Sequence, residues 1–132
     1  MQKFENIGEA PVSSIMQPKV ICVKPSYSIK TTIETFRVHQ ISCAPVITDD
    51  GKIYGIISEH DLLIQAGSTP IEHSIDFKKQ VTAVFPESTI KEVLMLFFSK
   101  RLKHAPVLDH KDHVIGIVSR IDLLNYLATN AS

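Results

Sequence analysis

Residues 43–63 read CAPVITDDGKIYGIISEHDLL, and residues 104–124 repeat the pattern as HAPVLDHKDHVIGIVSRIDLL. Both stretches contain Ala-Pro-Val, then Gly-Ile followed by Ser, then Asp-Leu-Leu at the same spacing. Extended without a gap, the match pairs residues 20–63 with 81–124, and 15 of the 44 aligned positions are identical. Self-similarity over this length indicates two copies of one structural unit.

Each copy predicts a strand followed by a helix. The runs at residues 20–23 and 81–84 are rich in β-forming residues, and a proline soon after each run stops the strand. Ser28 and Thr89 then stand where a helix N-cap is expected. Thr89 is followed three residues later by Glu92, which is the pattern of a capping box. Apolar residues continue at helical spacing in both copies.

The repeated stretch itself predicts a hairpin and a second helix. Residues 49–51 read Asp-Asp-Gly, a typical hairpin turn, and residues 109–113 take this place in the second copy. The second helix is expected to begin at Ser58 in one copy and at Ser119 in the other. The two strands joined through the first helix should run parallel, and the hairpin strands antiparallel.

The predicted fold class is α/β (α+β), built from two β-α-β-β-α repeats. Three strands with two helices leave one face of the sheet bare, so we expect the repeats to pack face to face with pseudo-twofold symmetry. The expected organisation is a first repeat over 12–66, a linker with a short helix over 67–80, and a second repeat over 81–128, together forming one compact module. The expected core takes one apolar set from each repeat: Ile29, Ile33, Phe36, Val46 and Ile56, and Ile90, Leu94, Phe97, Val107 and Ile117.

The composition is that of an ordinary globular protein. Hydrophobic residues make up 44% of the 132 residues, and 14 basic residues balance 14 acidic ones, so no nucleic-acid partner is expected. The longest apolar run, residues 93–98, is too short to cross a bilayer, so no membrane insertion is expected. Cys22 and Cys43 form no metal or disulfide pattern. We expect reduced core thiols and a cytoplasmic protein.

Two further segments complete a family pattern: Val-Ser-Ser-Ile-Met-Gln-Pro at residues 12–18 and Val-Ile-Cys-Val-Lys-Pro at residues 20–25. Together with the repeated stretch, they resemble the CBS-domain family from Val12 to Leu127. The resemblance implies a CBS pair, or Bateman module, that binds AMP, ADP, ATP or S-adenosylmethionine in a cleft between the repeats. It also implies a non-catalytic regulatory module, which forms a homodimer and modulates an effector protein that the sequence does not identify.

Ser119 and Asp122 are the first candidate site residues. A helix N-terminus attracts phosphate, Ser119 adds a hydroxyl donor, and an ionised Asp122 can accept hydrogen bonds from both hydroxyls of a ribose. In nucleotide-binding members of the family, the matching residues hold phosphate and ribose. The same spacing is also that of an ordinary capped helix, and the sequence leaves both interpretations open.

Basic residues distinguish the second copy. Arg120 follows Ser119, and Lys103 and His104 lead into the Ala-Pro-Val strand, so a phosphate tail would meet concentrated positive charge. Each could equally be a solvated residue at a helix end. The resemblance adds two further groups to this site: Met16, Gln17 and Pro18 from the other repeat, and Ala105 and Pro106 beside the adenine.

A second, weaker site is expected in the first copy, around Ser58 and Asp61. Glu59 stands where Arg120 stands in the second copy, and an acid there repels phosphate. This site is therefore expected to be empty or to take an adenosyl group without phosphates. Its expected lining is completed by Cys43, Ala44 and Pro45.

No catalytic, cofactor or metal site is expected. Residues 109–113 carry metal-binding types of side chain, but in a predicted turn and without a zinc spacing. Cys43 with His39 lacks the third group that orients a nucleophilic pair.

The alternative function is a structural dimerisation or docking module with a vestigial cleft. In either case a homodimer is expected from the apolar residues of the second helices: Leu62, Leu63, Leu123, Leu124 and Tyr126.

Overall fold

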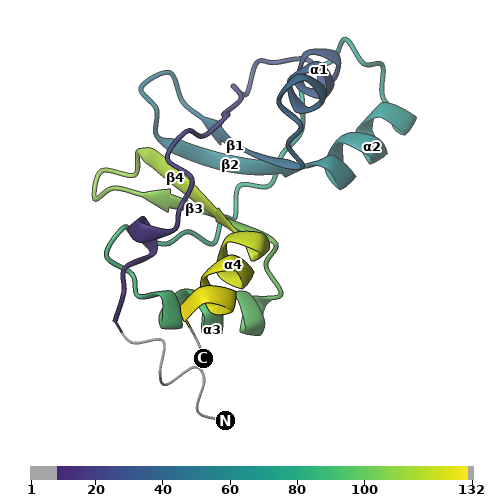
Figure 1. The fold of residues 1–132 in the computed structure, drawn as a ribbon. Helices are drawn as coiled ribbons and strands as arrows, with labels where there is room; N and C mark the ends of the chain where they lie inside the picture. Colours follow the sequence, from purple (N-terminus) through teal and green to yellow (C-terminus); the bar gives the residue numbers. More distant parts are fainter. Residues whose placement is uncertain (1–8, 131–132) are drawn as a thin grey trace. The chain divides into compact units, whose positions relative to one another are not determined.

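The structure is a computed structural model that describes residues 9–130 (Figure 1). Each repeat contributes a helix, two strands and a second helix, as predicted for an α/β fold. The elements are the 3-10 turn η2 (Val12–Ser14), then α1 (Ile29–His39), β1 (Cys43–Ile47), β2 (Ile53–Ser58) and α2 (Glu59–Ser68), then α3 (Ile90–Lys100), β3 (His104–Leu108), β4 (Val114–Ser119) and α4 (Arg120–Asn130). Among residues 9–130, no helix combines the length and apolar character that crossing a bilayer takes.

The helix starts follow the local capping signals in the sequence. Ser28 and Ser58 each accept a hydrogen bond from a backbone N–H of the following first turn, and Thr89 forms the expected capping box. The C-terminal ends are also duplicated. Gln40 after α1 and Arg101 after α3 both adopt the left-handed conformation, each with φ of 54°. The two copies therefore share their backbone geometry as well as their sequence pattern.

The strands form two antiparallel hairpins, β1–β2 and β3–β4. The first predicted strand of each repeat is reduced to a single parallel bridge, from Val23 to Val46 and from Val84 to Val107. The predicted direction is confirmed, but the predicted length is wrong.

Prolines explain why this pairing stops after one residue. Val23 N–H donates to Pro45 O at 3.0 Å, and Ile47 N–H donates to Val23 O at 2.9 Å. The next donors of a parallel ladder would be the backbone nitrogens of Pro45 and Pro25, and neither carries a hydrogen. Pro106 and Pro86 limit the second copy in the same way.

The chain divides into two compact units that cut across the sequence repeats. Within residues 9–130, unit 1 contains 9–19, 82–111 and 115–130, and unit 2 contains 20–81 and 112–114. The segment before the first repeat therefore packs with the second repeat, and the linker packs with the first. The short helix expected over 67–80 is absent: α2 continues to Ser68, and residues 70–80 form turns and isolated bridges.

Two glycines allow these returning segments to approach a strand closely. A Cβ on Gly55 of β2 would lie 2.5 Å from Lys78 O, and a Cβ on Gly116 of β4 would lie 2.5 Å from Met16 Sδ. Because an added Cβ would require these neighbours to move, glycine lets residues 77–78 lie along β2 and residues 16–17 along β4.

Each unit has its own hydrophobic cluster, led by Val23, Ile29 and Val46 in unit 2 and by Ile90, Val107 and Val118 in unit 1. Six residues of the expected core are buried: Ile29, Phe36, Val46, Ile90, Phe97 and Val107. The other four are half-buried: Ile33, Ile56, Leu94 and Ile117. Ile56 and Ile117 miss the core because side chains alternate along a strand, and their neighbours Ile57 and Val118 occupy it.

Candidate functional site

Asp122 lies in the first turn of α4, and both of its carboxylate oxygens have partners within unit 1. Oδ2 accepts hydrogen bonds from the Ser119 backbone N–H and from the Ser119 hydroxyl, both at 2.9 Å. Oδ1 accepts a hydrogen bond from Gln17 Nε2 at 3.0 Å. The half-buried residue therefore closes the start of the helix through Oδ2 and reaches another segment through Oδ1.

Gln17 is brought to Asp122 by backbone pairing with β4. Its N–H donates to Ile117 O at 2.8 Å, and Ile117 N–H donates back to Gln17 O at 3.0 Å. Met16 fits against Gly116 and packs on the core of unit 1, while Pro18 is exposed. The structure thus brings the predicted segment 16–18 to the Ser119/Asp122 pair, with Gln17 as the residue in contact.

The contact borders a hollow of about 530 Å³ in unit 1. It is lined by Ser14, Ile15, Gln17, Asp122, Asn125, Tyr126, Thr129 and Asn130. Five of these lie on α4, at positions i, i+3, i+4, i+7 and i+8 counted from Asp122, so they share one helix face. Asn125 and Thr129 are not among the residues expected from the sequence, although their helical spacing from Asp122 is a signal that points to them.

The basic residues are distributed differently from the expectation. Arg120 Nε donates to Leu102 O at 2.8 Å, and its side chain lines a separate groove between α3 and α4. Arg120 therefore does not line the hollow that contains Asp122. Lys103 is exposed in the connection before β3, and His104 is half-buried at the first position of that strand.

The Ala-Pro pairs lie in the hydrophobic interior of their units. Ala105 and Pro106 are fully buried in unit 1, and Ala44 and Pro45 are fully buried in unit 2. None of these four side chains is open to the surface in this structure. Adenine stacking on them stays a prediction.

Unit 2 repeats the Asp122 geometry around Asp61. Its Oδ2 accepts hydrogen bonds from the Ser58 N–H at 3.2 Å and from the Ser58 hydroxyl at 3.0 Å. The residue that pairs with β2 is Lys78: Ile56 N–H donates to Lys78 O at 2.9 Å, and Lys78 N–H donates back at 3.1 Å. Lys78 therefore holds the place in unit 2 that Gln17 holds in unit 1.

Lys78 changes the electrostatic comparison of the two sites. It lines a hollow of about 260 Å³ with Asp61, Ile64, Gln65, Asp76 and Phe77. The adjacent Lys79 places its ammonium 5.3 Å from the centre of the Tyr54 ring. The sequence expectation for the Ser58/Asp61 site rests on Glu59; the structure adds Lys78, which shares the hollow with the carboxylates of Asp61 and Asp76. The local pattern of residues 67–80 predicts a linker with a short helix, and the match of Lys78 with Gln17 emerges only when the 61-residue offset is carried upstream.

Cys43 is the first residue of β1, and its thiol lies in an environment that disfavours ionisation. Burial, with a smaller contribution from the Asp61 carboxylate, raises its pKa to about 12. Burial also raises the pKa of Cys22, with Lys24 acting in the opposite direction. Both residues are half-buried free thiols. A protonated Cys43 is a poor nucleophile at neutral pH.

The histidine-rich turn of residues 109–113 is engaged in surface contacts. His110 Nε2 lies 3.1 Å from Glu87 Oε1, and its ring stacks on Phe85 with centroids 5.5 Å apart. Asp109 Oδ1 accepts a hydrogen bond from the Lys111 N–H at 2.9 Å. Across residues 9–130, no three His, Cys, Asp or Glu side chains are placed to hold a metal ion.

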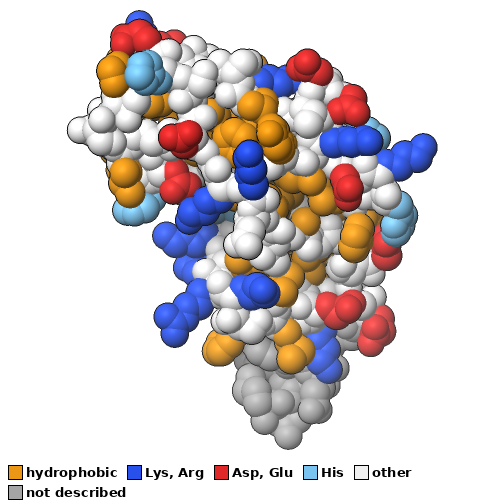
Figure 2. Space-filling view, turned by 180° about the vertical axis from the view of Figure 1, so that it is seen from behind, with side chains coloured by type: hydrophobic (Ala, Val, Ile, Leu, Met, Phe, Trp, Pro, Cys, Tyr) orange, Lys and Arg blue, Asp and Glu red, His pale blue; other side chains and the backbone are white. Residues whose placement is uncertain are grey.

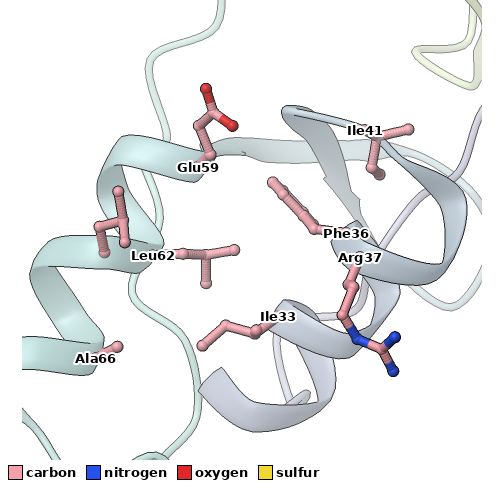
Figure 3. Close-up of a pocket in the computed structure, with 8 residues that line it drawn as sticks. Ile33, Phe36, Arg37, Ile41, Glu59, Leu62 and Ala66 are labelled. Carbon is pink, nitrogen blue, oxygen red and sulfur yellow. The ribbon is translucent and has the colours of Figure 1, made fainter.

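Each unit also has an apolar groove between its two helices. In unit 2 the groove has a volume of about 340 Å³, and Ile33, Phe36 and Leu62 converge on it from α1 and α2 (Figure 3). The corresponding groove of unit 1, about 570 Å³, includes Phe98 and Leu124. The space-filling view in Figure 2 shows hydrophobic side chains at the surface, among charged ones.

Sequence comparison finds a family and several distant relatives. The model of the CBS domain matches residues 12–66 and 74–129. An uncharacterized protein of Methanocaldococcus jannaschii is 26% identical over 113 residues, which are 86% of this chain but 42% of the relative. An uncharacterized 17.7 kDa protein of Acidianus ambivalens is 27% identical, with 88% of this chain and 72% of the relative covered. The inosine-5′-monophosphate dehydrogenase of M. jannaschii is 27% identical over 80% of this chain and 21% of the enzyme.

Solved structures show the same fold. CBSX2 in complex with AMP has a TM-score of 0.83 at 22% identity, covering 90% of this chain and 96% of that one. The CBS domain pair of protein MJ0100, in complex with 5′-methylthioadenosine and S-adenosylmethionine, has a TM-score of 0.82 at 21% identity and the same coverage. With the family model matched over most of its length, the chain belongs to the CBS-domain family and carries two CBS domains, over residues 12–66 and 74–129.

Proposed function

We propose that the protein is a regulatory module that binds an adenosine-containing ligand at Asp122 and changes the activity of a partner protein. The observation that carries the proposal is the placement of Asp122. Ser119 holds one carboxylate oxygen, and the other lies at a hollow lined by polar side chains of α4. A carboxylate held in this way is suited to accept hydrogen bonds from the vicinal hydroxyls of a ribose.

The size and lining of the hollow support a small ligand. Its volume of about 530 Å³ falls in the usual range of roughly 300–1,000 Å³ for ligand pockets. Asn125 and Thr129 offer donors and acceptors beside Asp122, and Tyr126 offers an aromatic face. Two solved structures with this fold are complexes with AMP and with S-adenosylmethionine.

The charge around the site favours a ligand with a short phosphate tail or none. Lys103 and His104 are the basic residues proposed for phosphate. Arg120, which the sequence placed beside them, donates its Nε–H to Leu102 O instead. With this cation held elsewhere, AMP and S-adenosylmethionine are better candidates than ATP, whose larger charge needs more cations.

Calorimetry with AMP, ATP and S-adenosylmethionine tests the proposal. Expected dissociation constants are micromolar to millimolar, which correspond to binding free energies of about −8 to −4 kcal/mol. Ligand at a hundred times its dissociation constant should stabilise the fold by about 2.7 kcal/mol. Asp122→Ala should remove most of this effect, and Asp61→Ala, its match in the other repeat, should leave the unit 1 event in place. No binding of any adenosyl compound would contradict the proposal.

We further propose that the module pairs with a second copy of itself through the two helix grooves. Leu63 is 72% exposed, Phe98 83% and Leu124 60%, which is much apolar surface to leave in water. The groove of unit 2 contains Glu59 and Arg37, whereas the groove of unit 1 contains two arginines, Arg101 and Arg120, and no acid among the described residues. This difference in charge favours contact between unlike grooves of two copies.

Light scattering tests the pairing. The wild type should have the mass of a dimer at tens of micromolar, and Leu124→Glu should give the mass of a monomer because it buries a charge in the contact. A monomeric wild type would contradict the pairing. If a dimer forms but no adenosyl ligand binds, a structural docking module becomes the better description, and the exposed helix faces are the observation that favours it.

A further inference from the structure

The hydrogen bond between Gln17 and Asp122 occupies the oxygen that a ribose would use. Asp122 Oδ2 already accepts two hydrogen bonds from Ser119. Oδ1 accepts the Gln17 amide at 3.0 Å. Ribose hydroxyls that bind at Oδ1 must therefore compete with an amide N–H that is already there.

The competing group is part of the fold and is held in place. Two backbone hydrogen bonds, of 2.8 and 3.0 Å, pair Gln17 with Ile117, two residues before Ser119 on the same strand. The side chain is exposed, so it can leave Asp122 for water while the backbone pairing stays intact. The amide can thus be displaced without unfolding the segment.

Unit 2 has the same backbone arrangement with a different side chain. Lys78 pairs with Ile56 as Gln17 pairs with Ile117. Among the described residues, Asp61 Oδ1 has no hydrogen bond comparable to that of Asp122 Oδ1. The residue that pairs with the second strand of each hairpin is therefore a neutral amide in unit 1, Gln17, and a cation in unit 2, Lys78.

We propose that the Gln17 amide competes with the ribose hydroxyls for Asp122 Oδ1. This competition lowers the affinity of the Asp122 site, so that ligand displaces the amide only when it is abundant. The inference rests on the proposed adenosyl function. It assigns Gln17 the role of setting the ligand concentration at which the module responds. Since ligand must break an existing hydrogen bond, removing the amide should strengthen binding.

Calorimetry with adenosine on the whole chain tests this directly. Gln17→Ala should bind about threefold to tenfold more tightly than wild type, the effect of one modest hydrogen bond. Lys78→Ala, at the matching position of unit 2, should show no such gain at the Asp122 site. Equal or weaker binding by Gln17→Ala, while the wild type binds, would overturn the inference and leave the proposed function standing. Absence of binding by both proteins would remove the proposed function and the inference with it.

Nuclear magnetic resonance of the wild type provides a second readout, from the Gln17 side-chain amide itself. Saturation with adenosine should release the Gln17 side-chain amide. Its resonances should move toward those of the same amide in Asp122→Ala, where the acceptor is missing. Resonances that keep their ligand-free positions at saturation would overturn the proposed competition.

Discussion

Alanine at Gly55 and at Gly116 should have different effects on stability, although the two glycines occupy matching positions of the two repeats. Neither has a positive φ, so the backbone at both sites tolerates alanine and the effect is steric. At Gly55 the added Cβ would lie 2.4 Å from the ring of Phe77 and 2.5 Å from the backbone oxygen of Lys78. At Gly116 its nearest neighbour, also at 2.5 Å, is the thioether sulfur of Met16.

The magnitude follows from what must move. A carbon next to a carbonyl oxygen normally keeps about 3.3 Å, so the Lys78 backbone must shift by almost 1 Å. Such a shift breaks the two hydrogen bonds between Lys78 and Ile56, each worth about 0.5–1.5 kcal/mol. After the gain of about 0.4–1 kcal/mol from a less flexible unfolded chain, the loss of these bonds should make Gly55→Ala cost about 0–2.6 kcal/mol, and displacement of the Phe77 ring adds to it.

The Met16 side chain can rotate away, so Gly116→Ala should cost less than about 1 kcal/mol. Urea unfolding followed by circular dichroism measures both variants against wild type. Gly116→Ala combined with Met16→Ala should recover the steric part of the loss, because the clashing sulfur is then absent. A Gly116→Ala loss equal to or larger than that of Gly55→Ala would refute the assignment of a close backbone clash to Gly55 and not to Gly116.

Two further predictions concern titratable groups. The Thr89 N–H and hydroxyl donate hydrogen bonds to Glu92 and lower its pKa. The stabilisation by this capping box should therefore be present above pH 4.5 and lost as pH falls below that value. Urea unfolding at pH 7 and pH 3.5 should show a smaller change in unfolding free energy for Glu92→Gln than for wild type. Because burial raises the pKa of Cys43 to about 12, the unfolded chain loses this proton first, and stability should fall as pH rises from about 8.5 toward 12. Cys43→Ser should flatten that decline, and an unchanged slope would contradict the origin assigned to it.

The parts of the fold that depend on neighbouring residues could be predicted from the sequence. The hairpins follow from the Ala-Pro-Val and Gly-Ile segments around a turn, and the helix starts follow from Ser28, Ser58 and Thr89. These features are set by capping and turn rules that act over a few residues. The pairing of Ser119 with Asp122 was foreseen in the same way, both as a helix cap and as a candidate ribose site.

The contacts of the two segments that contain Gln17 and Lys78 could not be predicted from local patterns. Gln17 pairs with Ile117, and Lys78 pairs with Ile56, each through one isolated bridge. A single bridge leaves no alternation of apolar residues to detect. For this reason the sequence pattern places Lys78 in a linker, and the helix that it predicts over 67–80 is wrong.

The direction of a long side chain also lies beyond sequence reasoning. Arg120 stands next to Ser119 in the chain, which suggested that it faces the same ligand. In the structure its Nε–H donates to Leu102 O, and its side chain lines the groove between α3 and α4. The choice between these directions depends on a carbonyl 18 residues away, which no pattern near Arg120 reveals.

The contact between Asp122 and a ribose is tested most directly by a cycle that removes each partner in turn. AMP and its 2′-deoxy and 3′-deoxy analogues are titrated into wild type and Asp122→Ala. Loss of a hydroxyl that binds the carboxylate should weaken wild-type binding by about 1.5–3 kcal/mol and should have little effect on Asp122→Ala, giving a coupling energy of the same size. An equal loss in both proteins, or a loss that disappears in Asp61→Ala instead, would contradict the assignment of the ribose to Asp122.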